Sequence, residues 1–118
     1  MILVVGSTGL LGTEICRHLA DAEKPFRAMV RHTSDPAKKD VLKQLGGELV
    51  EADLKDRTSL DRACDGATAV ITTPTAISSQ DTEDTFDKVD LRGQMDLVDA
   101  ARAAKVEHYV FISVSAIF

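Results

Sequence analysis

The amino-acid sequence predicts an α/β protein of the doubly wound class, in which helices cover both faces of a parallel β-sheet. Short β-branched runs alternate with segments of helical periodicity along the chain. This alternation is typical of βαβ units, whose right-handed crossovers build a parallel sheet. The runs Ile2–Val5 and Ala69–Ile71 are also continuously apolar, as strands buried on both faces are. We therefore expect a five-stranded sheet with the spatial order 3-2-1-4-5.

The five expected strands are short and rich in β-branched residues. They are the segments Ile2–Val5, Phe26–Arg31, Glu48–Glu51, Thr68–Thr72 and His108–Ser113. Neither a repeat nor a low-complexity linker interrupts them, so residues 1–118 are interpreted as one domain, in keeping with typical domain sizes of roughly 100–200 residues.

Helical periodicity and capping residues define the segments between the strands. In the first helix, Leu11, Ile15 and Leu19 recur at i, i+4 spacing and so share one face. The third helix follows Asp56, an N-cap residue, and ends at Gly66. The second, third and fourth helices are expected at Pro36–Leu45, Arg57–Cys64 and about Glu83 to Ala104.

Composition excludes several classes of function. The chain has 14 Lys and Arg against 19 Asp and Glu, a formal net charge of −5, with one Tyr and no Trp, so no basic, aromatic surface for nucleic acid is expected. No apolar run approaches the roughly 20 residues of a membrane span. The two cysteines, Cys16 and Cys64, form no disulfide framework, and no His, Cys and Asp cluster has zinc spacing. We expect a cytoplasmic protein without a metal.

The most informative segment follows the first strand and opens the first helix. A glycine-rich turn at this place lets backbone N–H groups and the helix N-terminus approach a pyrophosphate. The glycine spacing is Gly-x-x-Gly-x-x-Gly rather than the Gly-x-Gly-x-x-Gly fingerprint, and it lacks the Lys-Ser/Thr ending of a nucleotide-hydrolysing P-loop. The alternative is a tight turn in which Gly12 only allows close helix packing. The predicted ligands are Gly6, Ser7, Thr8, Gly9, Leu10, Leu11 and Gly12.

The end of the second strand indicates which dinucleotide binds. In NAD-binding units an acidic residue at this point bonds the ribose 2′-hydroxyl, but here Arg31 occupies the place. A guanidinium suits a 2′-phosphate by charge and by its fork geometry. We therefore expect NADP(H) rather than NAD, with Arg31 as the main ligand of the 2′-phosphate and Lys38 or Lys39 as an additional ligand. The alternative for Arg31 is a solvated charge at a strand end.

Five motifs spread along the chain can be compared with known families. The motifs are Gly6–Gly12, Met29–Arg31, Glu51–Leu54 before Ser59 and Leu60, Gly93–Ala101, and the strand Tyr109–Ser113. Together they resemble the NmrA-like family, an atypical branch of the short-chain dehydrogenase/reductase superfamily. Extended short-chain enzymes that act on nucleotide sugars share several of these motifs. The resemblance spans essentially the whole chain and implies a Rossmann fold that binds NAD(P).

The resemblance also implies further cofactor contacts. Asp53 and Leu54 match positions that contact adenine, the alternative being a capping carboxylate and a core side chain. Thr72, Thr73 and Pro74 end the fourth strand, where the family's chain passes the ribose and pyrophosphate. Independently, ligands of open α/β sheets bind at the carboxyl ends of the strands. Residues 74–84 are expected to be a mobile loop beside the nicotinamide.

The catalytic part of the resembled enzymes is largely missing. Standard short-chain reductases use Tyr-x-x-x-Lys, but four residues after Tyr109, the only tyrosine, stands Ser113. Ser115 matches, better than Ser113, a serine that hydrogen-bonds the substrate carbonyl. The alternative is a strand-end serine that caps its own backbone. We therefore expect this chain to be the cofactor half of a longer reductase, truncated relative to the full family fold after Phe118.

The implied function is the NADP(H)-binding domain of an oxidoreductase that delivers hydride to a carbonyl, quinone or conjugated double bond of a small-molecule substrate. One alternative is a redox sensor that binds the dinucleotide without turnover. Another is a fragment of a nucleotide-sugar epimerase or dehydratase, which Arg31 disfavours. Because the strand His108–Ser113 would be an unpaired edge followed by apolar residues, we expect a homodimer, or aggregation, through this edge.

Overall fold

A five-stranded parallel sheet forms the centre of the computed structural model, which describes residues 1–73 and 92–112. The strand order is β3-β2-β1-β4-β5, and every neighbouring pair is parallel. The predicted fold class and strand order are therefore confirmed. The elements in chain order are β1 (Ile2–Val5), α1 (Leu10–Asp21), β2 (Phe26–Val30), α2 (Pro36–Gln44), β3 (Glu48–Glu51), α3 (Arg57–Cys64), β4 (Ala69–Thr72), α4 (Gln94–Ala103) and β5 (His108–Phe111).

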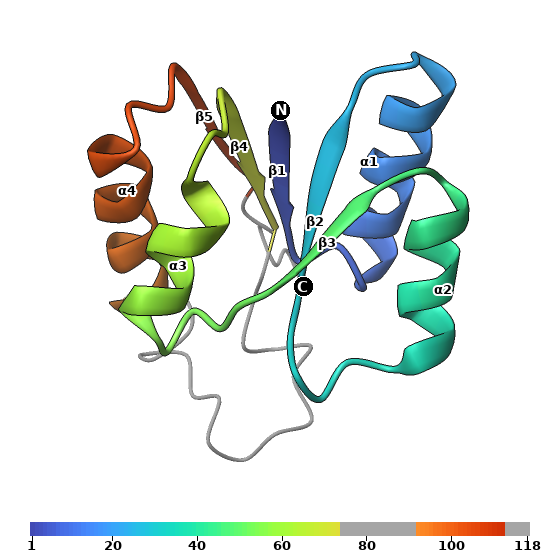
Figure 1. Ribbon diagram of the computed structural model, residues 1–118, viewed down its shortest axis with the longest axis horizontal. Helices are drawn as coiled ribbons and strands as arrows, with labels where there is room; N and C mark the ends of the chain where they lie inside the picture. Colours follow the sequence, from blue (N-terminus) through green and yellow to red (C-terminus); the bar gives the residue numbers. More distant parts are fainter. Residues whose placement is uncertain (74–91, 113–118) are drawn as a thin grey trace, which may run out of the picture.

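The helices lie in two layers on opposite faces of the sheet. Figure 1 shows α1 and α2 on one face and α3 and α4 on the other. Each of the strands β1 to β4 is followed in the element order by a helix and then by the next parallel strand. As a result, the carboxyl ends of all five strands lie along the same edge of the sheet.

The observed boundaries differ from the expected ones by a residue or two. The second strand ends at Val30 because Arg31 begins a tight turn. In this turn the Arg31 N–H donates to Ser34 Oγ at 2.9 Å, and the Ser34 N–H donates to the Arg31 carbonyl at 3.0 Å. Residues 83–91 of the expected long helix and Ser113 of the expected last strand lie outside the described residues.

Capping residues fix the ends of two of the helices. Asp35 and Asp56 precede α2 and α3, and each carboxylate accepts a hydrogen bond from the backbone two residues on, at 2.9 and 3.1 Å. Gly46 and Gly66 follow the same helices with φ of +87° and +79°, a conformation that favours glycine and ends a helix. The predicted N-cap at Asp56 and the predicted helix end at Gly66 are confirmed.

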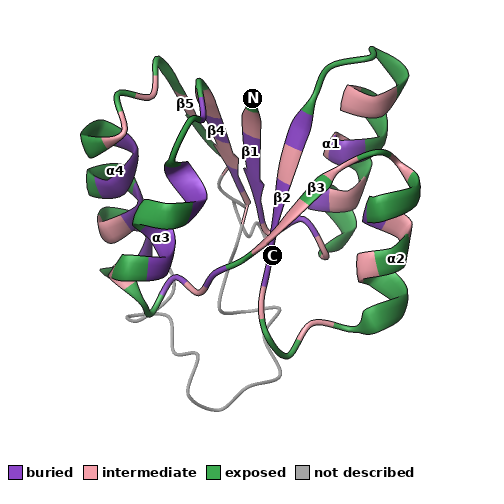
Figure 2. Cartoon of the chain, in the orientation of Figure 1, coloured by how far each residue is buried: buried purple, intermediate pink, exposed green. Residues whose placement is uncertain are grey.

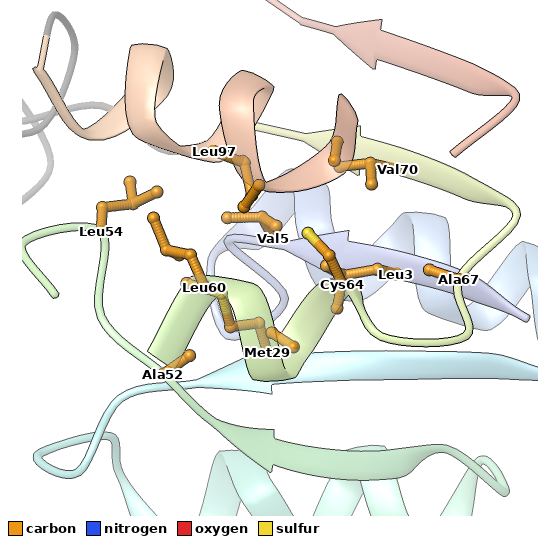
Figure 3. Close-up of a cluster of buried hydrophobic side chains, with 13 residues drawn as sticks. Leu3, Val5, Met29, Ala52, Leu54, Leu60, Cys64, Ala67, Val70 and Leu97 are labelled. Carbon is orange, nitrogen blue, oxygen red and sulfur yellow. The ribbon is translucent and has the colours of Figure 1, made fainter. Parts of the chain in front are cut away.

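Two hydrophobic clusters hold the helix layers against the sheet (Figure 2). The larger lies under α3 and α4 (Figure 3) and includes the labelled residues Leu3, Val5, Leu60, Cys64, Val70 and Leu97. The smaller lies under α1 and α2 and consists of Val4, Cys16, Phe26, Ala28, Val30 and Leu42. Burial raises the pKa of the Cys16 and Cys64 thiols to about 11, so both stay neutral and act as packing residues.

The buried face of α1 is not centred where the sequence pattern places it. Gly12 and Cys16 are the buried residues of this helix, whereas Leu11 is 46% exposed. Gly12 has no Cβ, so the side of the helix that carries Gly12 can approach the backbone of the preceding turn closely. Ile15 and Leu19, both partly buried, pack at the margin of the smaller cluster.

β5 forms one edge of the described sheet. Its side chains Val110 and Phe111 are 49% and 48% exposed, so the strand is less buried than a doubly covered strand. The homodimer expected through this edge stays a prediction.

Candidate functional site

The carboxyl edge of the sheet begins with the turn between β1 and α1, here called the phosphate loop (residues 6–12). Gly6 has φ of +85°, which a residue with a side chain rarely adopts. The N–H of Gly9 donates to the Gly6 carbonyl at 3.1 Å. A Cβ added at Gly12 would lie 2.0 Å from that same carbonyl oxygen. The first and last glycines are therefore required by the shape of the loop itself.

Two hydroxyl groups brace the phosphate loop from within. Ser7 is fully buried, and its Oγ donates to the Met29 carbonyl of β2 at 2.8 Å. Thr13 Oγ1 donates to the Ser7 carbonyl at 2.8 Å. The Ser7 side chain is thus turned into the protein, and this residue can meet a ligand only through its backbone. Sequence reasoning missed Thr13, whose position in the first turn of a helix was the available signal.

The N-terminus of α1 differs from those of α2 and α3. Asp35 and Asp56 cap the latter two, whereas among the described residues no side chain caps α1. The first N–H groups of a helix have no acceptor within the helix. Leu10 is 90% exposed, so this end of the helix is open to solvent. Backbone N–H groups and the helix dipole together favour an anion here.

The second part of the edge is the β2–β3 corner, formed by Arg31 and His32 after β2 and by Glu51 and Asp53 at the end of β3. The Arg31 Nε lies 4.0 Å from Asp53 Oδ2, and the two side chains are 36% and 38% exposed. The other carboxylate oxygen, Asp53 Oδ1, accepts the Lys55 N–H at 2.9 Å. The guanidinium is thus held at the place where the sequence predicts a 2′-phosphate.

Ser59 fixes the turn after β3, and sequence analysis did not identify this role. It is 5% exposed, and its Oγ accepts the Asp53 N–H at 3.0 Å and donates to the Asp56 carbonyl at 2.7 Å. Leu54, one residue further on, is buried in the larger cluster, so it can offer a ligand only its backbone. The signal for Ser59 was its place three residues after the N-cap Asp56, where a hydroxyl can bond back to the preceding turn.

The end of β4 supplies the third part of the edge. Thr72 is fully buried and its Oγ1 donates to Gln94 Oε1 at 3.3 Å. Thr73 Oγ1 donates to the Val5 carbonyl at 3.2 Å. Tyr109 Oη also donates to Gln94 Oε1, at 3.5 Å, and burial raises its pKa to about 12. Both threonine hydroxyls are therefore engaged within the fold, and Tyr109 remains a neutral packing residue.

The remaining predicted residues lie on α2 or outside the described residues. Lys38 and Lys39 belong to the first turn of α2, directly after the turn that Arg31 begins. Pro74, Ser113 and Ser115 lie outside the described residues. Within residues 1–73 and 92–112, no three His, Cys, Asp or Glu side chains gather as a metal site. None of the described helices is both long and apolar enough to span a membrane.

A parallel sheet in the order 3-2-1-4-5, with a glycine turn between its central strand and an uncapped helix, is typical of a dinucleotide-binding Rossmann domain. The chain belongs to the NmrA-like family, whose model matches residues 1–117. The family that the sequence motifs resemble is therefore confirmed.

Two relatives illustrate how widely this family has diverged. The chain is 37% identical over 113 residues to the photosystem II assembly factor Ycf39 of Cyanophora paradoxa, covering 96% of this chain and 34% of that protein. It is 36% identical over 110 residues to an NAD(P)H azoreductase of Xenophilus azovorans, covering 93% of this chain and 34% of the enzyme. The chain thus spans about a third of the length of these relatives.

Solved structures with bound cofactor share the fold. An NADPH-dependent quinone oxidoreductase from Escherichia coli, solved with NADPH, matches with a TM-score of 0.70 and 25% identity, over 94% of this chain and 36% of that one. A short-chain dehydrogenase/reductase superfamily protein from Agrobacterium tumefaciens, solved with NAD, matches with a TM-score of 0.74 and 30% identity, over 94% and 31%. The fold therefore accepts either dinucleotide.

Proposed function

We propose that this chain is the NADP(H)-binding domain of an oxidoreductase. The observation that carries the proposal is the uncapped N-terminus of α1 behind a glycine turn, with the guanidinium of Arg31 held at the neighbouring strand end. The first feature suits a pyrophosphate and the second a 2′-phosphate. NAD(P)H azoreductase and quinone oxidoreductase relatives support the reaction class.

The pyrophosphate would lie against the phosphate loop. Gly6, Gly9 and Gly12 leave the backbone without side chains at this turn, and a Cβ at Gly9 would already lie 3.3 Å from the Gly6 carbonyl oxygen. The N–H groups of the first turn of α1 would donate to the phosphate oxygens, and Ser7 and Thr13 hold the loop in shape from behind. Binding here depends on backbone geometry and does not distinguish NADP(H) from NAD(H).

The adenosine end would lie over the β2–β3 corner. Arg31 would donate to the 2′-phosphate, and Lys38 or Lys39 would add positive charge from the first turn of α2. Asp53, whose N–H and carbonyl are both hydrogen-bonded to Ser59, would meet the adenine. The charge and fork shape of the guanidinium favour a phosphate over a hydroxyl, so selection of NADP(H) is assigned to this corner.

A bound nicotinamide dinucleotide supplies hydride to a carbonyl, quinone or conjugated double bond. The described residues bind and orient it, with Thr72 and Thr73 fixing the end of β4 beside the path of the ribose. Ser115 remains the proposed hydrogen-bond donor to a substrate carbonyl. Residues of the longer protein would complete the substrate site, since the chain spans about a third of its relatives.

The test is the affinity for NADPH and NADH of the unaltered chain and of Arg31→Ala. Hydrogen bonds to charged groups contribute about 1.5–3 kcal/mol, so we expect the substitution to weaken NADPH binding by about 10- to 100-fold and to leave NADH binding nearly unchanged. Arg17→Ala is the matched control, because Arg17 lies on α1 in an exposed pair with Glu14. Equal affinities for the two cofactors, unchanged by Arg31→Ala, would refute the proposal.

A second candidate is a regulatory protein that binds the dinucleotide without turnover. The relationship to Ycf39, named as an assembly factor, favours it. Oxidation of NADPH by the longer protein, measured over a panel of quinones, azo compounds and carbonyl compounds, separates the two. Turnover supports the oxidoreductase, and tight NADPH binding with no turnover on any substrate supports the regulator.

A further inference from the structure

The β2–β3 corner contains a second contact between a basic and an acidic side chain, beside the ion pair made by Arg31. His32 Nδ1 lies 3.5 Å from Glu51 Oε1, and the two side chains are 94% and 59% exposed. Arg31 and His32, which follow β2, therefore each have a carboxylate next to them, from Asp53 just after β3 and from Glu51 at its end. Neither His32 nor Glu51 contributes to the core.

Strand pairing fixes this arrangement of charges. In the parallel register Val30 lies opposite Glu51, and the Ala52 N–H donates to the Val30 carbonyl at 3.0 Å. The pairing thus continues to the last residue before Arg31. Arg31 and His32 then follow β2 alongside Glu51, the last residue of β3, and Asp53, two residues further on. This is the place where the 2′-phosphate is proposed to bind.

We propose that Glu51 is a specificity-determining residue that lowers the preference for NADP(H) over NAD(H). This inference rests on the proposed function. Glu51 acts in two ways: its charge repels a 2′-phosphate, and it holds His32 toward β3. Neither effect acts on a 2′-hydroxyl, which is uncharged. Loss of the carboxylate therefore strengthens the binding of NADPH and leaves that of NADH unchanged.

Glu51 is the carboxylate of the corner that can be tested cleanly. Asp53 accepts the Lys55 N–H and is joined to Ser59 through its backbone, so its substitution would also alter the turn after β3. The Glu51 side chain is exposed and pairs only with exposed His32 among the interactions of the described residues. Its backbone carbonyl accepts from Arg62 at 2.7 Å, and a change of side chain keeps that bond.

The experiment compares NADPH and NADH affinities of the unaltered chain and of Glu51→Gln at low ionic strength. Exposed ion pairs shift equilibria by about two- to fivefold, so we expect the NADPH-to-NADH affinity ratio to rise by about that factor. The rise should shrink at about 0.5 M salt, where exposed charges are screened. Adenosine 2′,5′-bisphosphate and AMP, titrated separately, should show the same change for the bisphosphate alone.

Glu48→Gln is the matched control. It removes the same charge from the same strand three residues earlier, roughly 10 Å away at the usual strand rise, where Glu48 pairs with Arg27 at 3.4 Å. The ratio of NADPH affinity to NADH affinity should stay at its original value in this variant. An equal rise in Glu48→Gln would show a general effect of net charge and would overturn the inference.

The second variant isolates His32. In His32→Asn the effect of Glu51→Gln should become smaller, because the released imidazole no longer contributes. An unchanged ratio in Glu51→Gln, while Arg31→Ala still weakens NADPH binding, overturns the role of Glu51 and leaves the proposed function standing. Absence of NADPH binding by the unaltered chain overturns both.

Discussion

The phosphate loop and the β2–β3 corner lie on the same edge of the sheet but are built by opposite means. The loop is fixed by backbone contacts: a positive φ at Gly6, a Gly12 without room for a Cβ, and the buried Ser7 bonded to β2. The corner consists of side chains that are 36% to 94% exposed, with Arg31 and Asp53 paired at 4.0 Å and His32 in contact with Glu51 at 3.5 Å. The phosphate loop is therefore held by backbone packing, whereas the corner is made of exposed side chains that can be substituted without disturbing the backbone.

The difference separates two properties of a dinucleotide site. A rigid loop that reads only a pyrophosphate serves every dinucleotide equally, so changes there should affect binding and stability together. Exposed charges contribute little to stability, so changes at the corner can alter the choice between NADP(H) and NAD(H) without harming the fold. Solved relatives with NADPH and with NAD are consistent with such a division.

The largest effect is expected for Gly12→Ala, which breaks the rigid part. The new Cβ would lie 2.0 Å from the Gly6 carbonyl oxygen, so α1 and the loop must move apart. Overpacking of this kind costs about 1–3 kcal/mol of folding free energy, and binding of NADPH and NADH should fall together by more than about tenfold. Chemical denaturation and titration with both cofactors measure the two effects.

Gly9→Ala provides a graded comparison for the same loop. Its Cβ would lie 3.3 Å from the same oxygen, a contact that small shifts can relieve, so both losses should be smaller than for Gly12→Ala. Equal stability and affinity of Gly12→Ala and the unaltered chain would mean that the loop is not rigid.

The next largest effect is expected for Ser7→Ala. The variant leaves the Met29 carbonyl without the hydrogen bond that a fully buried hydroxyl now donates at 2.8 Å. A buried group left without its partner costs about 1–3 kcal/mol, so the free energy of unfolding should fall by that amount. NADPH and NADH binding should weaken by the same factor, because the loop is proposed to contact the pyrophosphate, which both cofactors carry. A change in their ratio would contradict the division between loop and corner.

The smallest effect is expected for Ser59→Ala, which loosens the backbone under the corner. The backbone groups of Asp53 and Asp56 that it bonds are near the surface and can turn to water, so the variant should lose about 1 kcal/mol of stability. Both cofactors carry adenine, and both should bind slightly more weakly. If only the affinity for NADPH fell, Ser59 would instead contribute to the discrimination between the 2′-phosphate and the 2′-hydroxyl.

The sequence was sufficient to predict the fold, because its signals are local. Alternating apolar strands and helices determine the sheet, and Asp56 and Gly66 mark the ends of α3. The position of the phosphate loop also follows from glycines close together in the chain. These features need no knowledge of distant contacts.

The remaining details depend on contacts between distant residues. Ser7 turns inward because Met29, 22 residues away, offers its carbonyl. Leu11 is exposed because Gly12 and Cys16 face the sheet instead. The pairs Arg31–Asp53 and His32–Glu51 exist because β2 and β3 are neighbours in a particular register. Periodicity and motif spacing carry no information on such pairings.

The most direct test of the account is the calorimetric titration of the unaltered 118-residue chain with NADPH and NADH at one fixed ionic strength. We predict one cofactor per chain and an affinity for NADPH at least about tenfold higher than for NADH, since a guanidinium bonded to a phosphate contributes more than about 1.4 kcal/mol. Equal affinities, a preference for NADH or the absence of saturable binding would contradict it.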